Sequence, residues 1–223
     1  PFSWASPMSE IELPQVNVGW YARTFTVDKD KSWAGKNIYL IFGASDFHTK
    51  VWVNNQLVGE HKGGYVPFEF NISAALAPGE NQLVVRVEDE ELDNRPSGKQ
   101  YYGNAKGIWQ TVYLEPRTEL HLAGLRFYPD IDRQQVGVTV RLASPAPDGV
   151  RFKLAGKNNT LLFEATFPAG ETAADFTIPV AEMKLWSLDK PFLYEVTASL
   201  ATTAITDQVN TYFGMRKISA VSI

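Results

Sequence analysis

The stretch VWVNNQLV, residues 51–58, decides the fold of the first half of the chain. Val51 to Val53 can pair back on Leu57 and Val58 around a turn at Asn54 and Asn55. Asparagine tolerates the positive φ angles that a tight hairpin turn requires. We therefore expect an antiparallel β-hairpin at this position.

Alternation of apolar and polar side chains continues outward from the hairpin, which is typical of half-buried strands. Helical periodicity is scarce, and one short turn is expected in NISAALAPGEN, capped by Ser73. The strands predicted around the hairpin are GWYARTFTV (19–27), KNIYLIFGA (36–44), NQLVVRVED (81–89) and WQTVYLE (109–115).

The second half of the chain contains seven further short alternating segments in about 100 residues, the number and length of an immunoglobulin-like β-sandwich. With the boundary near residues 116–119, we predict an all-β protein of two domains, residues 1–117 and 118–223. The seven predicted strands are residues 119–129, 134–144, 149–155, 160–167, 173–179, 192–201 and 208–214.

Composition excludes several classes of partner and site. Lysine and arginine number 21 against 25 acidic residues, a net charge of −4, and no basic run suits a nucleic acid or an anionic membrane. The 223 residues include no cysteine, which excludes disulfides and thiolate metal sites. The first residues, PFSWASPMSEIELP, lack the features of a signal peptide, and we expect a chain excised from a longer one. Bacterial cytoplasm and periplasm fit equally.

Motifs for catalysis and metal binding fail on spacing. The segment GASDF (43–47) has Phe47 where a nucleophile elbow needs glycine, and no helix is predicted after it. The three histidines lack the spacing of a zinc site, and no carboxylate pair is singled out. We therefore expect no metal, no cofactor and no catalytic residue in this chain.

The long connection LDNRPSGKQYYGNAKGIW (92–109) is the strongest candidate for a binding site. It combines amide and cationic donors with aromatic rings, which together suit a ligand rich in hydroxyl groups. From these residues alone, a binding loop and a solvated connection remain equal alternatives.

Several motifs resemble glycoside hydrolase family 2, which includes β-galactosidases, β-glucuronidases and β-mannosidases. WYARTF (20–25), the run GASDFHTKVWVNNQLVGEHKGGYVPFEFNIS (43–73) and GKQYYGNAKGIWQTVYLEP are similar to its N-terminal sugar-binding domain. LWSLDKPFLYEV (185–196) and YFGMRKI (212–218) are similar to its immunoglobulin-like domain. The resemblance implies a jelly-roll sandwich, then an immunoglobulin-like sandwich, then a catalytic TIM barrel that acts with retention. Because a barrel needs about 250 further residues, we expect this chain alone to be inactive.

The resemblance also implies where substrate is contacted, since loops of the family's first domain reach the rim of the barrel. The matching residues are Lys99, Gln100, Tyr101 and Asn104, with Asn17 a weaker candidate from a second loop. Trp109 is expected to pack under the loop, and His61 to donate a hydrogen bond to a loop carbonyl. Without the barrel we expect only millimolar affinity for sugar, on the order of 4 kcal/mol.

Three functions compete. Under the first hypothesis, the chain is the non-catalytic portion of a β-galactosidase-like hydrolase, with a glucuronidase or mannosidase parent left open. Alternatively it is a free-standing carbohydrate-binding module that stacks sugar on Tyr101, Tyr102 or Trp109, or a structural pair of sandwiches without a ligand. The partners expected under the first are a carbohydrate, the catalytic barrel and, through an exposed apolar interface, a homo-oligomer.

Overall fold

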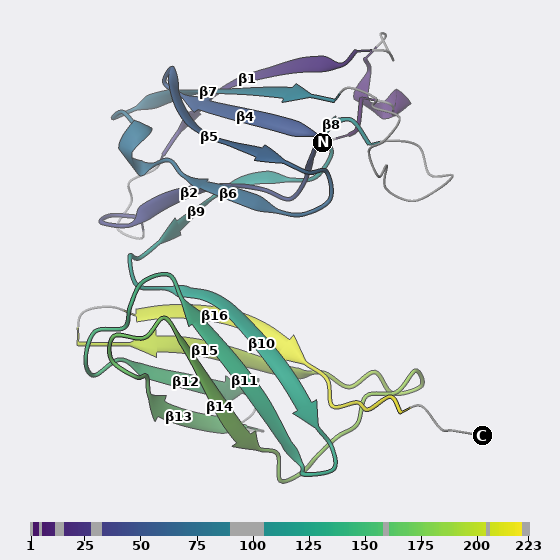
Figure 1. Cartoon of the computed structure of the whole chain (residues 1–223), viewed down its shortest axis with the longest axis vertical. Helices are drawn as coiled ribbons and strands as arrows, with labels where there is room; N and C mark the ends of the chain where they lie inside the picture. Colours follow the sequence, from purple (N-terminus) through teal and green to yellow (C-terminus); the bar gives the residue numbers. More distant parts are fainter. Residues whose placement is uncertain are drawn as a thin grey trace. The chain divides into compact units, whose positions relative to one another are not determined.

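The computed structural model describes residues 2–4, 6–11, 16–27, 33–89, 105–157, 161–203 and 206–219. The chain divides into two compact units, residues 1–117 and 118–223. Both are built almost entirely of antiparallel strands (Figure 1), which confirms the all-β fold class. Within the described ranges, no helix is long and apolar enough to cross a membrane.

The first unit contains a four-stranded and a three-stranded sheet. The larger has the order β1 (Val18–Thr26), β7 (Glu80–Glu88), β4 (His48–Val53) and β5 (Gln56–Lys62). The smaller has the order β6 (Phe68–Asn71), β2 (Asn37–Phe42) and β9 (Val112–Arg117). A two-stranded ladder joins β3 (Ser45–Asp46) to β8 (Gly107–Ile108). The described residues of this unit also form the 3₁₀ turns η1 (Pro7–Ser9) and η2 (Ser73–Ala75).

The predicted hairpin is confirmed. Val53 pairs with Gln56, and the two residues between them have φ angles of 49° at Asn54 and 66° at Asn55. Two positive φ angles define a type I′ turn, whose twist matches that of the strands. The Asn54 side chain also donates to Asn81 Oδ1 at 2.7 Å, which ties the turn to the start of β7.

The predicted cap of the short turn is wrong. The residue before η2 is Ile72, which makes no side-chain cap. Ser73 Oγ instead accepts a hydrogen bond at 2.8 Å from the backbone N–H of Ile38, at the start of β2. The Ser73 hydroxyl, which the sequence predicted to cap the turn, therefore bonds the backbone of β2 instead.

All seven strands predicted for the second unit are present. One sheet has the order β10 (Leu122–Asp130), β11 (Gln135–Leu142) and β14 (Ala173–Pro179). The other has the order β13 (Leu162–Thr166), β12 (Arg151–Gly156), β15 (Tyr194–Ala201) and β16 (Thr206–Phe213). The fourth strand thus pairs with the third, whereas in an immunoglobulin constant domain it pairs with the fifth.

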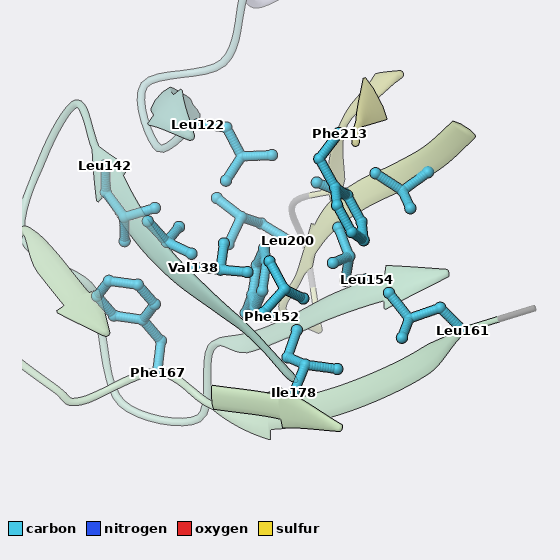
Figure 2. Close-up of a cluster of buried hydrophobic side chains, with 14 of the residues drawn as sticks. Leu122, Val138, Leu142, Phe152, Leu154, Leu161, Phe167, Ile178, Leu200 and Phe213 are labelled. Atoms are coloured by element: carbon cyan, nitrogen blue, oxygen red, sulfur yellow. The ribbon is translucent and has the colours of Figure 1, made fainter. Parts of the chain in front are cut away.

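Each unit has its own core of alternate strand residues. Figure 2 shows the core of the second unit, where Val138, Phe152, Ile178 and Leu200 meet between the two sheets. These side chains are at most 1% exposed, and each contributes about 1.5–3 kcal/mol by leaving water. In the first unit, Val51, Val53, Val85 and Val87 play the same part on β4 and β7. Their alternation sends the intervening side chains to the outer face.

Candidate functional site

The candidate site lies at one end of the first unit, where β1 begins and β7 ends. The small strands β3 and β8 both contact β7. We call this end the rim and define it by five residues from separate segments: Asn17, Asp46, Tyr65, Asp89 and Trp109. Strand ends are suited to present polar groups because the sandwich interior fixes the backbone beneath them.

The backbone at the rim fixes both flanks of residues 90–104, which lie outside the described part of the chain. On one side, the N–H of Asp89 donates to the carbonyl of Asn17 at 2.8 Å. On the other, the Lys106 carbonyl accepts from Trp4 N–H at 3.1 Å, and Lys106 N–H donates to Ser3 Oγ at 2.8 Å. The flanking residues are therefore positioned by β1 and by the N-terminal segment.

Trp4 fills the space beneath the rim. Its side chain is 5% exposed and lies against Gly19 and Gly107, where a Cβ atom would come within 2.2 Å and 2.3 Å of the ring. Its indole N–H donates to the hydroxyl of Tyr21, which also accepts from Ile108 N–H at 3.0 Å. Burial raises the pKa of Tyr21, so the hydroxyl stays protonated in neutral solution. Trp4 thereby joins β1 to β8.

An acidic and aromatic corner lies on the other side of the rim. The Asp46 carboxylate is packed so closely on Gly64 that a Cβ there would lie 2.5 Å from Oδ1. The Gly64 carbonyl accepts from Trp109 Nε1 at 2.8 Å. Tyr65 meets the Trp109 ring edge-on, with centroids 5.8 Å apart, and is 51% exposed. Gly64 is required here because any side chain would displace Asp46.

The Tyr65 hydroxyl lies near two carboxylates, those of Asp46 and Asp89. Partial burial raises the pKa of this hydroxyl, and the charges of Asp46 and Asp89 raise that pKa further. Carboxylates accept hydrogen bonds, tyrosine hydroxyls donate and accept them, and aromatic rings pack on C–H faces. The rim therefore has the groups needed to bind a polyhydroxyl ligand.

Of the predicted contact residues, the structure describes Asn17, which is exposed at the rim. Lys99, Gln100, Tyr101 and Asn104 lie outside the described residues, as does Tyr102. Trp109 is partly buried, with its indole N–H bonded to Gly64.

Sequence reasoning missed Asp46 and Tyr65 as candidates. These residues lie in the segments GASDF and GGYVPF, but the contacts that bring them together join residues distant in the sequence. Asp46 packs on Gly64, about 20 residues away, and Trp109 bonds Gly64 from 45 residues away. A glycine directly before an exposed tyrosine was the available signal.

The rejected motifs have structural roles. Ser45 is fully buried and accepts a hydrogen bond from Thr49 Oγ1 at 2.8 Å, so it is no exposed nucleophile. His48 pairs with Glu60, and His121 bonds the Thr118 carbonyl. Across the described ranges, no three histidine or acidic side chains are grouped as metal ligands.

The prediction for His61 is wrong. Among the described residues, its Nε2 atom is buried without a hydrogen-bond partner. The ring stacks on Phe68 with centroids 4.0 Å apart. The imidazole therefore serves as a flat packing group, and burial lowers its pKa.

Comparison with known proteins gives a consistent result for both units. Residues 3–115 match the model of the glycosyl hydrolases family 2 sugar binding domain, and residues 120–216 match a second glycosyl hydrolases family 2 model. A β-galactosidase of Thermoanaerobacter pseudethanolicus is 31% identical over 90% of this chain and 28% of its own length. A putative β-glucuronidase of Formosa agariphila is 28% identical over 91% of this chain and 20% of its own length.

Solved structures show the same arrangement of strands. A Bacteroides uniformis β-glucuronidase aligns with a TM-score of 0.72 and 26% identity over 90% of this chain and 26% of its own. A family 2 member from Bacteroides cellulosilyticus aligns with a TM-score of 0.74 and 24% identity, over 98% of this chain and 32% of its own. The chain thus spans about a fifth to a third of the proteins it matches.

Proposed function

From the membership of this chain in glycosyl hydrolase family 2, we propose that it supports the catalytic barrel of a retaining β-galactosidase and contributes the rim to that barrel's substrate site. The chain corresponds to the N-terminal, non-catalytic part of the β-galactosidase- and β-glucuronidase-like members of the family. The observation that carries the proposal is the convergence of Asn17, Asp46 and Tyr65 at one end of the first unit. Alone, the chain has no activity, because the acid and nucleophile of retaining hydrolysis belong to the barrel.

The relatives favour a galactoside over a glucuronide. The β-galactosidase of Thermoanaerobacter pseudethanolicus is 31% identical to this chain, against 28% for the putative β-glucuronidase of Formosa agariphila.

The first test is the coding sequence on both sides of residues 1 and 223. A frame that continues past Ile223 for about 250 residues or more, with glutamates at strand ends, supports the proposal. A stop codon directly after Ile223 refutes the enzyme function and leaves the free-standing carbohydrate-binding module as the function to test.

In the intact protein, Asp46→Asn tests the contribution of the rim. A hydrogen bond from a substrate hydroxyl to a carboxylate is worth about 1.5–3 kcal/mol, so kcat/KM for nitrophenyl β-galactoside should fall about 10- to 100-fold. The matched control is Asp148→Asn, at an exposed aspartate of the second unit, which should leave kcat/KM unchanged. Equal values for the two variants would contradict substrate contact at the rim.

A further inference from the structure

Trp20 is a large aromatic side chain that the first unit leaves in solvent, with 63% of its surface exposed. Its neighbour Tyr21 points inward toward Trp4, so alternation places Trp20 on the outer face of the β1-β7-β4-β5 sheet. Strand pairing sets Arg86 of β7 directly opposite Trp20, and Lys50 of β4 opposite Arg86. The three side chains therefore form one row across the sheet.

The orientation of Trp20 is fixed by two contacts. Its ring stacks on Trp52 of β4, with centroids 5.7 Å apart and planes inclined by 27°. The guanidinium of Arg86 lies 5.9 Å from the Trp20 ring centroid and is held by Glu88, with 2.7 Å between Nη1 and Oε2. We call Trp20, Trp52 and Arg86 the tryptophan platform. A ligand that stacks here finds the rings already ordered, which lowers the entropic cost of binding.

The charged groups beside the platform are arranged in pairs. Arg86 bonds Glu88, while Glu60 of β5 lies 3.5 Å from Lys50 Nζ and 3.1 Å from His48 Nε2. Donors and acceptors therefore stand side by side with their charges largely offset. A hydroxyl group both donates and accepts, so this arrangement suits a neutral polyhydroxyl ligand better than an ion.

We infer that the tryptophan platform binds a neutral oligosaccharide, with the C–H face of a pyranose ring stacked on Trp20 and its hydroxyls bonded to Arg86 and Glu88. This surface lies on the face of the sheet and consists of described residues alone. It requires neither residues 90–104 nor a catalytic barrel, so it stands independently of the proposed function.

The composition of the surface argues against a protein partner. Lysine and glutamate are depleted at the centre of a protein–protein interface. Here Lys50 and Glu60 lie in the same row as the exposed ring of Trp20. An aromatic ring bordered directly by paired charges matches the alternating C–H and O–H surface of a sugar chain.

The experiment is a titration of the purified 223-residue chain, followed by tryptophan fluorescence and by calorimetry. The ligands are the β-1,4-linked tetrasaccharides of galactose, glucose and mannose, with tetragalacturonate as the anionic comparison. We expect at least one neutral tetrasaccharide to bind with a millimolar or lower Kd, and tetragalacturonate to bind at least tenfold more weakly.

Variants identify the platform as the binding surface. Trp20→Ala should weaken binding about tenfold or more, since it removes the stacking face. Tyr212→Ala is the matched control, because Tyr212 is also 63% exposed but lies on β16 of the second unit. Arg86→Gln, which keeps both tryptophans, should weaken binding several-fold. Urea midpoints of the three variants show whether each first unit remains folded.

Three results would overturn the inference: no neutral tetrasaccharide bound at 10 mM or so, binding that Trp20→Ala and Arg86→Gln leave unchanged, or stronger binding of tetragalacturonate. A concentration-dependent dimer that Trp20→Ala abolishes would also overturn it, because a second copy would then be the occupant. A structure of a longer form in which another domain covers Trp20 would have the same consequence.

Discussion

The packing of Trp4 beneath the rim predicts an unusually large effect of one methyl group. Gly107 has φ +74°, and a Cβ added there would lie 2.3 Å from the indole ring of Trp4. Gly79 has a similar φ of +84°, but no heavy atom lies within 4 Å of its added Cβ. The two glycines therefore share the backbone conformation and differ in the space available to a side chain.

Gly107→Ala should destabilise the first unit by about 2–5 kcal/mol. Left-handed backbone costs a non-glycine residue roughly 1–2 kcal/mol. Overpacking against Trp4 and the Tyr21 hydroxyl adds about 1–3 kcal/mol, since the Trp4 ring also packs on Gly19. Gly79→Ala, the matched control, should cost only the backbone contribution of roughly 1–2 kcal/mol.

Urea unfolding monitored by tryptophan fluorescence measures this difference. Five of the six tryptophans belong to the first unit, so the signal reports that unit. The double variant Trp4→Ala/Gly107→Ala closes a thermodynamic cycle, and its cost should fall short of the sum of the single variants by about 1–3 kcal/mol. If Gly107→Ala costs no more than Gly79→Ala, no side chain packs closely on Gly107. An additive cycle would instead assign the overpacking to the Tyr21 hydroxyl, which a Cβ at Gly107 would meet nearly as closely as it meets Trp4.

Two further predictions concern buried titratable groups. Burial raises the pKa of Tyr21 above its ordinary 10.0, so the folded state holds the proton more tightly than the unfolded state. The free energy of unfolding should therefore fall as pH rises past 10. Tyr21→Phe should remove that dependence in urea midpoints measured from about pH 8 to 10.5. The same variant should cost about 2–3 kcal/mol at pH 7, because it leaves Trp4 Nε1 and the Ile108 N–H without their shared acceptor. Burial lowers the pKa of His61 below 6.5, so the unfolded state binds the proton more tightly and stability should be lost as pH falls below 6.5. His61→Phe should abolish that loss and raise the free energy of unfolding by about 1 kcal/mol, because Nε2 has no hydrogen-bond partner. His121→Phe is the matched control. It should lower the free energy of unfolding by about 1–3 kcal/mol, because it removes the hydrogen bond to the Thr118 carbonyl. A midpoint for Tyr21→Phe that still falls above pH 10, or a destabilised His61→Phe, would contradict these assignments.

Sequence predicted the strands well because their signal is local. Val51 and Val53 indicate one buried face within three residues. Asn54 and Asn55 predict the turn because asparagine tolerates positive φ angles. The seven strands of the second unit follow from the same alternation. None of these features depends on which strand lies beside which.

The contacts at the rim could not be predicted because they join segments distant in the chain. Trp4 lies between Gly19 and Gly107, and Asp46 lies on Gly64. In the sequence, each glycine indicates only a turn or a weakened strand. The folded structure shows why glycine is needed, because the Trp4 ring or the Asp46 carboxylate occupies the space of a side chain. Ser73 fails for the same reason, because its partner Ile38 is 35 residues away.

The alternation of β1 separates two functions within one dipeptide. Trp20 points outward to the tryptophan platform, and Tyr21 points inward to Trp4 and β8. Since adjacent residues of a strand face opposite sides, substitution of one leaves the contacts of the other in place. Trp20→Ala should therefore change binding at the outer face while the urea midpoint stays near that of the parent chain. Tyr21→Phe should lower the midpoint and leave the platform's affinity for saccharide unchanged. A coupled response of both properties to either substitution would mean that the strand transmits strain between its faces, and the rim and the platform would then form a single site.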